Sequence, residues 1–578
     1  YTDEYVIAGY TVQDFGAKGD GVTDDTKAFQ DAIDAAAAAG GCTIWVPEGR
    51  YAIKGNLVMK QGVSINGEID TPGRDKAVKG TILQAYAGRG SIEGDPFIMM
   101  QPVTGIHDLA IWYPEQEADN IQPYPPAIQM GDPSVWGNDY VTVDNIEFVN
   151  AYLGYKNNPN MGGCPIVRNI YGTPLKSGIR IDSLADVGRI ENCDFSPLYW
   201  ENSGLPGAPS DKDSHRSYIY ENGIAYEMSR NDWSYGRWLT ADRYGVGFYA
   251  LNSFCEGAWN GESRISNMYP NGENYGMKFS NCHIGVAIED TSNSGMVITH
   301  TEIDNCENGF VARNTMASKI SLIGWTINAT DNAILNEGTG QVMMQEMDIE
   351  SGKVSLSAGY ASMLNCKFNN AAPQITLGKY SNASILGSTF KETKTIENNS
   401  VLTVTVDDTP VEMEPTPEFP QVNVLEVKPP RAVMYNAKDF GVKIDGVTDD
   451  APAIQKALDK AAADGGGIVF LPPGFYGIKS ELTVPSNVEF RGALDTGTMP
   501  RKNGSTLEIY HGKGQEGGAT IHLQEKSTIR GICVDYPEQD YNDPIKFPYT
   551  VQGMGADVSI INMAIRNAYD FADLFTYR

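Results

Sequence analysis

The stretch that decides the fold is "DFGAKGDGVTDDTKAFQDAIDAA", which begins at Asp14 and returns almost unchanged as "DFGVKIDGVTDDAPAIQKALDKA" from Asp439. Each copy predicts a short strand, a Gly-rich turn, the acidic segment "GVTDD" and a helix. Either aspartate at the end of "GVTDD" is a candidate helix N-cap. Gly-Gly pairs from positions 40 and 465 are expected to end the helices, and apolar strands follow them. The chain therefore opens twice with the same unit.

The duplication continues beyond the opening. The segment "IWYPEQEADNIQPYP" from Ile111 is echoed by "VDYPEQDYNDPIKFP" from Val534, and the offset between copies stays near 423 to 425 residues. We interpret this as a tandem homology. It predicts a first domain over 1–405, a Pro-rich and extended linker over 406–432, and a second, apparently incomplete domain over 433–578.

A ladder of short repeats lies between the two openings. The fragments "VDNIEF", "VRNIYG", "IENCDF", "FSNCHI" and "MLNCKF" share one frame, and later strand starts recur every 21 or 22 residues. Such a period with short β-rich units predicts a solenoid of stacked strands. The recurring Asn is expected to stack into a ladder in which each side chain bonds its neighbour's backbone. Cysteines in the shared frame are expected to be free, buried thiols.

The block "DFGAKGDGVTDDTKAFQDAI", with the later "GGCTIWVPEGRY", resembles the amino-terminal signature of the pectate-lyase-like, right-handed parallel β-helix superfamily. Two such openings in one chain are similar to the family 55 glycoside hydrolases, which carry two β-helices side by side. The resemblance implies an all-β, right-handed parallel β-helix solenoid with an N-terminal cap helix, followed by the start of a second homologous β-helix. It also implies a β-1,3-glucan as the substrate.

Stacking turns sequence rows into site geometry, because neighbouring strands lie about 4.8 Å apart. Asp182, Glu227 and Glu289 share the fifth place of "GIRIDS", "GIAYEM" and "GVAIED", and Tyr249 falls between the last two. We expect the three carboxylates to form one exposed column, with spacings of about 5 and 10 Å that suit a glycosidase acid and its base or nucleophile. The alternative interpretation is a solvated acidic face.

An aromatic-rich insertion over 199–270 lies on the same rungs. Long excursions from a regular scaffold often carry the binding surface, and flat rings pack on the apolar faces of sugars. Some of these rings must instead close the insertion's own small core. The candidate substrate-binding residues are Trp200, Trp233, Trp238, Tyr249 and Trp259, together with Asp194 and the "YPEQ" pair Glu115 and Gln116.

Composition excludes several other classes of protein. The net charge of −29 and pI near 4.6 disfavour nucleic acid and anionic lipid as partners. No apolar segment approaches the roughly 20 residues that cross a bilayer, and the start lacks a signal peptide's basic and apolar regions. With six His and no metal or nucleotide motif, no metal and no cofactor are expected. The acidic "DGVTDD" segment suits turn hydrogen bonds better than Ca²⁺.

These observations together predict a secreted or cell-surface glycoside hydrolase that degrades a neutral glucan with paired carboxylates. A polysaccharide lyase on a uronate polymer is the first alternative, with Arg237, Arg243 and Arg313 available to bind the uronate. The second alternative is a noncatalytic surface, spike or filament protein. Long solenoids with exposed ends can associate, so a homo-oligomer is an open alternative.

Overall fold

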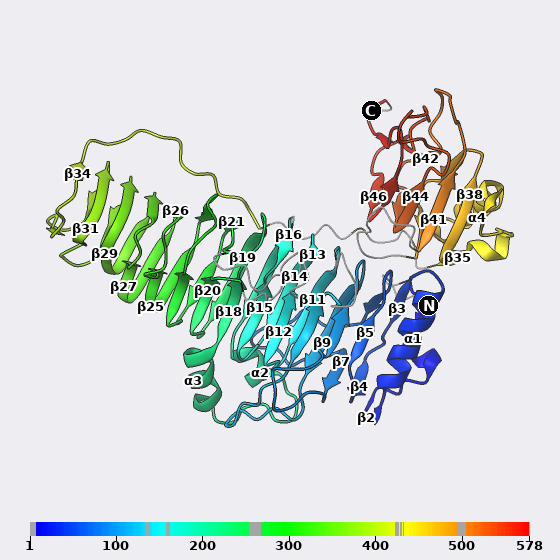
Figure 1. Ribbon diagram of the computed structural model, residues 1–578. Coiled ribbons are helices and arrows are strands. Elements are labelled where there is room, and N and C mark those ends of the chain that lie inside the picture. The colour runs from blue at the N-terminus through cyan, green and yellow to red at the C-terminus, as the bar shows by residue number, and fades with distance from the viewer. Residues whose placement is uncertain are drawn as a thin grey trace.

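The computed structural model describes residues 7–132, 139–157, 162–185, 187–253, 268–421, 427, 431, 433–493 and 504–576. Strands predominate, and the strand pairings that join successive coils are parallel (Figure 1). An N-terminal stack of coils runs from β1 (Tyr10–Thr11) to β34 (Val404–Asp407), and a C-terminal stack runs from β35 (Met434–Asn436) to β48 (Ala572–Asp573). The predicted all-β parallel solenoid is confirmed.

Each coil of the N-terminal stack contributes strand segments to three faces, which we call faces A, B and C. One coil consists of β21 (Gly272–Tyr275) on face A, β22 (Lys278–Ser280) on face B and β23 (Ile284–Ile288) on face C. Register pairs Ile320 with Val342 on face A, 22 residues later, as the sequence period predicts.

The remaining strands of the N-terminal stack repeat this order, and several long strands turn a corner to serve two faces. Face A includes β3 (Thr43–Trp45), β6 (Ser64–Asn66), β24 (Met296–Thr299), β26 (Lys319–Ile323) and β28 (Gln341–Gln345). Face B includes β2 (Asp20–Asp24), β4 (Gly49–Ile53), β7 (Thr81–Ala85), β30 (Lys367–Phe368) and β32 (Thr389–Phe390). Face C includes β5 (Leu57–Met59), β8 (Ile98–Met100), β10 (Pro126–Met130), β12 (Leu153–Asn157), β15 (Ser177–Ile181), β18 (Ile224–Met228), β20 (Val246–Ala250) and β33 (Ile396–Asn398). Faces A and B share β9 (Gly105–Trp112), β11 (Thr142–Phe148), β14 (Ile166–Gly172), β17 (Arg189–Phe195) and β19 (Tyr235–Asp242), while β25 (Glu302–Ala312), β27 (Thr326–Asn336), β29 (Asp348–Leu364) and β31 (Ile375–Leu386) turn other corners.

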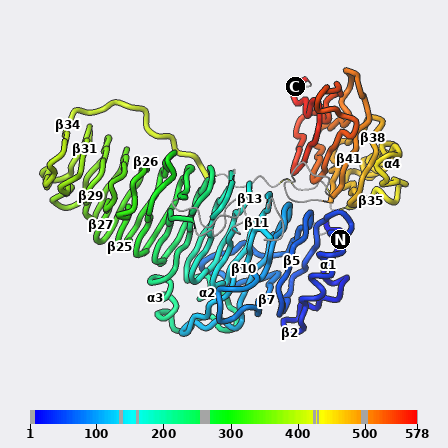
Figure 2. Tube along the Cα trace, in the orientation of Figure 1, coloured from blue at the N-terminus to red at the C-terminus, as the bar shows by residue number. Residues whose placement is uncertain are grey.

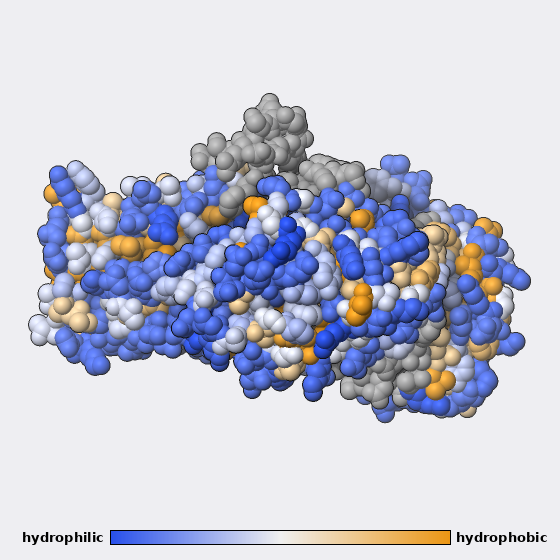
Figure 3. All heavy atoms as spheres, turned by 90° about the horizontal axis from the view of Figure 1, so that it is seen from below, coloured by the Kyte–Doolittle hydropathy of each residue, from blue (hydrophilic) through white to orange (hydrophobic). Residues whose placement is uncertain are grey.

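The core consists of side chains that stack along the inside of the coil. On face C, Ile179, Tyr226, Phe248, Val286 and Phe310 occupy one inward row on successive rungs, and all are fully buried. Burying each such side chain contributes roughly 1.5–3 kcal/mol. Because neighbouring rungs supply the contacts, the core extends continuously along the stack. On the view in Figure 3, hydrophilic residues cover most of the outside.

The corner between faces A and B carries the expected Asn ladder. Asn145, Asn169 and Asn192 have φ of 53°, 54° and 54°, in the left-handed region that Asn tolerates better than most residues. The Asn192 amide donates to Asn169 Oδ1 at 2.5 Å, and the Asn169 amide donates to Asp144 Oδ1 at 2.7 Å. The expected bonds to the neighbouring backbone are therefore wrong, because the short corner brings the amide of one rung to a side-chain oxygen of the next.

Replacing one rung of this ladder separates its two contributions. Asn169→Ala should lower the free energy of unfolding by about 2–3 kcal/mol, because it removes two hydrogen bonds and places Ala in the left-handed region. Asn169→Gly loses the same bonds without the backbone strain, so it should be about 1 kcal/mol milder. Denaturant unfolding of both variants measures the difference. Equal losses would show that the left-handed backbone contributes nothing.

The two openings share their detailed structure. Helices α1 (Thr26–Ala38) and α4 (Ala451–Ala463) both end at Gly pairs with left-handed φ, as expected. Of the two candidate aspartates before each helix, Asp25 and Asp450 make no capping side-chain hydrogen bond. Asp24 and Asp449 accept instead from the N–H of the first helical residue, Thr26 at 3.1 Å and Ala451 at 3.3 Å. The Asp25 carboxylate instead accepts from the N–H of Lys18 at 2.7 Å, and Asp450 accepts from Lys443 at 2.6 Å. These aspartates thus hold the preceding turn.

The C-terminal stack has its own three parallel sheets and its own cluster of buried side chains. Its remaining strands are β36 (Asp445–Asp449), β37 (Gly467–Phe470), β38 (Gly474–Ile478), β39 (Leu482–Val484), β40 (Val488–Arg491), β41 (Ser505–Ile509), β42 (Ile521–Leu523), β43 (Thr528–Arg530), β44 (Ile532–Asp535), β45 (Val551–Gly553), β46 (Ser559–Ile561) and β47 (Ala564–Arg566). It contacts the first coil of the N-terminal stack where the N–H of Thr43 donates to the Ala493 carbonyl at 3.2 Å.

The segment after β34 returns along the N-terminal stack, as Figure 2 shows. Residues 408–421, which we call the strap, contain no helix or strand. The strap follows the corner between faces A and B. Asn365 donates to the Val411 carbonyl at 2.9 Å, and Gln421 donates to Asn192 Oδ1 at 2.6 Å.

Seven of the eight cysteines are free and six of these are buried, as predicted, while Cys255 lies outside the described residues. Burial raises the pKa of the Cys42 thiol to about 12. These thiols are therefore small core residues. Within the described ranges, every helix falls short of the length and apolarity that a membrane span requires.

Candidate active site on face C

The predicted carboxylates lie on or beside face C, but in a different register from the one expected. Arg180, not Asp182, pairs with Glu227, and Glu227 pairs with Tyr249 on the next rung. Tyr249 then pairs with Ala287 of β23, which places Glu289 two residues further along the chain, just past the end of that strand. The expected single column of three carboxylates is therefore wrong. The packing of inward side chains such as Ile179 against Tyr226 sets the register, and a slip of two residues preserves which side chains point inward.

Glu227 is buried rather than exposed, with 1% of its surface accessible. The Arg180 guanidinium engages both of its carboxylate oxygens, from Nε at 2.8 Å and from the second nitrogen at 3.1 Å. This bidentate pair joins two adjacent rungs. A carboxylate held in this way is well suited to positioning the strand.

Asp182 is also buried, with 4% accessible, and it lies just past the end of β15. Its Oδ1 accepts from the Ser253 hydroxyl at 2.7 Å and from the N–H of Ser183 at 2.8 Å. Ser253 follows β20, so Asp182 connects two turns at this edge of face C. The exposed position expected for Asp182 is therefore wrong.

Glu289 is the most accessible of the three predicted carboxylates. One oxygen accepts from the Tyr249 hydroxyl at 3.0 Å, and the other accepts from the N–H of Asn252 at 3.1 Å. Burial and the negative charge of Glu289 raise the pKa of Tyr249, while the nearby Arg313 acts in the opposite direction. A phenol and a carboxylate are therefore placed together on face C.

A cavity of about 360 Å³ lies between face C and helix α3 (Asp213–Asn222). Arg313, which is next to Tyr249 and Glu289, lines it together with Lys176 and His283. His283 Nδ1 lies 3.0 Å from Glu307, whose carboxylate also accepts from Tyr220 of α3 at 3.4 Å. Through Arg313 the cavity lies next to the Tyr249 and Glu289 pair, and Lys176 and Arg313 are two cationic groups in its lining.

The tryptophans expected to form a wall beside the carboxylates are dispersed. Trp200 lies in α2 (Leu198–Asn202), is fully buried and meets His215 edge to face at 5.8 Å, so it closes the insertion's own core. Trp233 is 51% exposed, and Trp238 lies at the corner between faces A and B. Trp259 lies outside the described residues. The three described tryptophans share no single face, because Trp200 packs inside the insertion, Trp233 is exposed and Trp238 lies at a corner of the coil.

Asp194 ties the insertion to an early loop instead of projecting freely into a groove. Arg74 Nε donates to its carboxylate at 2.8 Å, and the Tyr199 hydroxyl donates to the same oxygen at 2.8 Å. The Thr240 hydroxyl donates to the other oxygen. Burial by itself lowers the pKa of Arg74, but the carboxylates of Asp194 and Asp242 raise it above its usual value. The guanidinium therefore stays charged. This arrangement is that of a structural clamp.

The "YPEQ" pair has the same structure in both copies. Gln116 is buried and exchanges two hydrogen bonds with the Gln122 backbone, at 2.9 and 2.7 Å. Gln539 does the same with Ile545, at 3.0 and 2.7 Å. Glu115 is exposed on the same turn. The duplication has thus preserved a loop brace, and the predicted substrate-binding role of Glu115 and Gln116 gains no geometric support.

Sequence rows did not single out two groups that the structure makes prominent. Arg180 forms an ion pair with Glu227. The alternation of side chains along β15 places Arg180 between the inward-facing Ile179 and Ile181, and this pattern was the available signal that Arg180 points outward. Glu147 on face B is 3% exposed, and burial raises its pKa to about 8. Glu147 is covered because α2 packs against the neighbouring β14, and only the fold brings that helix there. Across the described residues there is no cluster of three or more His, Cys, Asp or Glu side chains that could hold a metal.

Comparison with known proteins identifies the class of the repeated units. A family model described as rhamnogalacturonase A/epimerase, pectate lyase-like matches residues 10–115 and 434–570. Both copies of the opening therefore match the same pectate-lyase-like family model, as the resemblance in the sequence predicts.

Two relatives from Azotobacter vinelandii match short segments of the chain. Alginate lyase 7 is 52% identical over 65 residues, which are 10% of this chain and 8% of the relative. Mannuronan C5-epimerase AlgE4 is 42% identical over 93 residues, which are 13% of this chain and 16% of the relative. The matches thus span less than a fifth of either relative's length.

Solved structures resemble the chain at low identity. The A-module of mannuronan C-5 epimerase AlgE6 from Azotobacter vinelandii has a TM-score of 0.41 at 16% identity, and the match covers 70% of this chain and all of that module. The catalytic unit of a GH87 alpha-1,3-glucanase from Streptomyces thermodiastaticus has a TM-score of 0.30 at 15% identity, with 72% of this chain and 73% of that one covered.

Proposed function

We propose that the chain is a secreted enzyme that acts on polysaccharides, with face C around Glu289 as its active site. The observation that carries this proposal is the pairing of Glu289 with the Tyr249 hydroxyl at 3.0 Å beside a cavity of about 360 Å³. The names of the relatives, an alginate lyase and mannuronan epimerases, support a polysaccharide as the substrate. Tandem units over 1–405 and 433–578, joined by the 406–432 linker, are part of the proposal.

Hydrolysis of a glycosidic bond requires a proton donor together with a base or nucleophile. In the proposed mechanism the Glu289 carboxylate is the base or nucleophile. Tyr249 is the donor, because its hydroxyl lies 3.0 Å from Glu289 and a tyrosine phenol carries its proton at neutral pH. Glu227 is held by Arg180 and serves as a positioning residue. A catalytic role for Asp182, and a neutral glucan such as a β-1,3-glucan as the substrate, stay predictions.

The release of reducing ends from a panel of neutral glucans tests the proposal. Glu289→Gln keeps the size and hydrogen bonds of the side chain but removes its charge, so it should lower the rate about 100-fold. Glu302→Gln is the matched control, since Glu302 is 59% exposed on face B and pairs with Lys278. Full activity of Glu289→Gln, with a wild-type unfolding curve, would exclude this active site.

A polysaccharide lyase is the second candidate, because cationic groups line the same cavity. Lys176, His283 and Arg313 surround it and could bind a uronate carboxylate. Arg237 lies on face A and Arg243 pairs with Asp242, so neither belongs to this group. Unsaturated products from a uronate polymer, detected by ultraviolet absorbance, would assign the lyase reaction. If no substrate is turned over and light scattering reveals assemblies, the noncatalytic spike or filament alternative gains support.

A further inference from the structure

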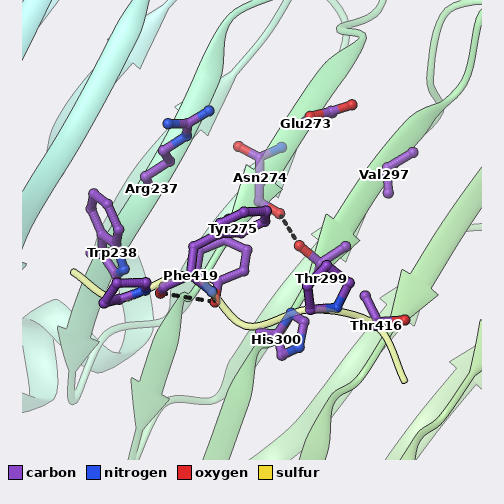
Figure 4. A pocket seen from close by; sticks show the side chains of 12 residues that line it. Arg237, Trp238, Glu273, Asn274, Tyr275, Val297, Thr299, His300, Thr416 and Phe419 are labelled. Carbon is purple, nitrogen blue, oxygen red and sulfur yellow. Dashed lines mark hydrogen bonds between the residues drawn. The ribbon is translucent and has the colours of Figure 1, made fainter. Parts of the chain in front are cut away.

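A second cavity lies on a different face, beneath the strap. Its volume is about 420 Å³, and it is enclosed by strands β19, β21 and β24 of face A on one side and by strap residues 416–420 on the other. Figure 4 shows Trp238, Tyr275, His300 and Phe419 gathered around it. None of the carboxylates proposed for catalysis lines this cavity.

The backbone of this corner departs from the Asn ladder where the cavity begins. Asn145, Asn169 and Asn192 occupy the left-handed corner positions on earlier rungs, but Trp238 and His300 occupy them here, with φ of 52° and 51°. A bulky residue in this region costs roughly 1–2 kcal/mol. Such strain persists where the surroundings hold the residue in place, and it is often found at functional sites. The ladder is thus replaced by two rings that border the cavity.

The rings around the cavity are mutually inclined rather than stacked in one layer. The planes of the Trp238 and Tyr275 rings are inclined at 83°, with centroids 6.3 Å apart. The Phe419 ring of the strap is inclined at 67° to the Tyr275 ring, with centroids 5.6 Å apart. The His300 ring lies 5.2 Å from Tyr275. Several ring faces and edges are therefore presented to one space. Pyranose rings are bound in this way, since their C–H faces pack on flat aromatic surfaces.

Polar groups at the cavity suit a neutral ligand with hydroxyl groups. Arg237 and Glu273 line it together, so their charges oppose each other. The buried Nδ1 of His300 has no hydrogen-bond partner among the described residues. Buried polar atoms in native proteins are nearly always paired, so this nitrogen is available to a ligand hydroxyl. The net charge of −29 further favours a neutral ligand over a polyanion.

The strap forms the roof of the cavity through a small number of contacts. The N–H of Phe419 donates to the Tyr275 hydroxyl at 2.5 Å, and that hydroxyl donates to the Phe419 carbonyl at 3.1 Å. Thr416 donates to the carboxylate of Glu346, another left-handed corner residue. Phe419 itself is 62% exposed. A segment held by few contacts opens at low free energy, so a ligand can enter beneath it.

We propose that this cavity is a second carbohydrate-binding site, distinct from face C, that takes a neutral oligosaccharide segment and closes over it with the chain's own strap. Trp238 and Tyr275 provide the packing surfaces, His300 offers a hydrogen bond, and Phe419 completes the wall. The site does not depend on catalysis at face C. An enzyme with such a site would hold a polymer at two places along its solenoid.

Titration calorimetry of the full chain with soluble neutral glucans tests the site, in a Glu289→Gln background so that the polymer is not degraded. Trp238→Asn removes the aromatic ring and introduces Asn, the residue that occupies the same left-handed corner position on the earlier rungs. This substitution should weaken glucan binding about 3- to 10-fold. Trp233→Asn is the matched control, since Trp233 also has a left-handed φ, of 59°, and is exposed away from the cavity. Phe419→Ala should weaken binding in the same direction.

Hydrogen exchange gives the second measurement. Added glucan should slow amide exchange over residues 416–421, because the strap closes on the bound ligand. Three results would overturn the proposal: no glucan in the panel binds, Trp238→Asn and Trp233→Asn weaken binding equally, or Trp238→Asn releases the strap while binding is unchanged. The last result would reduce the cavity to an anchor for the strap. Hydrolysis by a Trp238→Asn chain with Glu289 intact reports on face C separately.

Discussion

Arg180→Met should lower the free energy of unfolding by about 3–5 kcal/mol, because it leaves the Glu227 carboxylate buried without its partner. Glu227 is 1% exposed, and Arg180 engages both of its oxygens at 2.8 and 3.1 Å. The pair also joins adjacent rungs, so its loss affects the register of face C. Arg180→Lys keeps the charge but loses the fork of donors, and an intermediate loss is expected. Denaturant unfolding followed by circular dichroism measures each change.

The double variant Arg180→Met/Glu227→Met distinguishes a buried unpaired charge from lost packing. Removing both partners removes the desolvated carboxylate, so the double variant should recover most of the stability and lie within about 1–2 kcal/mol of the wild type. If Arg180→Met alone is as stable as the wild type, Glu227 finds water or another partner. The ion pair would then have no role in holding face C together.

A stability that falls as the pH rises is the second expected result, and Glu147 is its source. Burial raises the pKa of Glu147 from 4.5 to about 8, so the folded protein holds this proton more tightly than the unfolded chain does. The resulting stabilisation is complete below pH 4.5 and is lost as the pH rises through 8. Between pH 5 and pH 8 the loss should reach about 3–4 kcal/mol, from roughly 1.4 kcal/mol per pH unit.

Glu147→Gln isolates this contribution from the other titrating groups. Glutamine resembles the protonated acid and cannot ionise, so the variant's unfolding free energy should lack this part of the pH dependence. The difference between variant and wild type should grow by about 3–4 kcal/mol from pH 5 to pH 8. A difference that stays constant across this range would mean that the Glu147 carboxylate is solvated in the folded protein. Glu302→Gln, at an exposed position on face B, controls for surface charge.

The two proposed sites lie on separate faces of the N-terminal stack. Glu289 and Tyr249 lie beside Arg313, which lines the cavity on face C, and Trp238 and His300 line the cavity on face A. In a solenoid each face runs along the whole length of the stack. One extended polymer could therefore contact both cavities only if it crossed a corner between two faces. The strap already crosses the stack along the corner between faces A and B, from Val411 to Gln421.

The amino-acid sequence by itself determined the solenoid, its duplication and its inward rows. Periodic repeats fix these features because each coil can bury its apolar side chains only against the next coil. The inward side chains Tyr226 and Phe248 are fully buried, as the alternation along their strands predicts. The stacked Asn row and the buried thiols follow from equally local signals.

Only the tertiary structure decided the register between rungs, and with it the site. Because the turns differ in length, Gly178 lies opposite Ala225 in the register of β15 and β18. Arg180 therefore pairs with Glu227, and Asp182 lies past the end of β15. A shift of two residues leaves the alternation of inward and outward side chains unchanged, and for this reason no pattern within one repeat could reveal it. The burial of Glu147 beneath α2 and the strap over Trp238 depend on segments distant in the chain. Contacts of that kind are fixed by packing between elements and leave no local periodic signal.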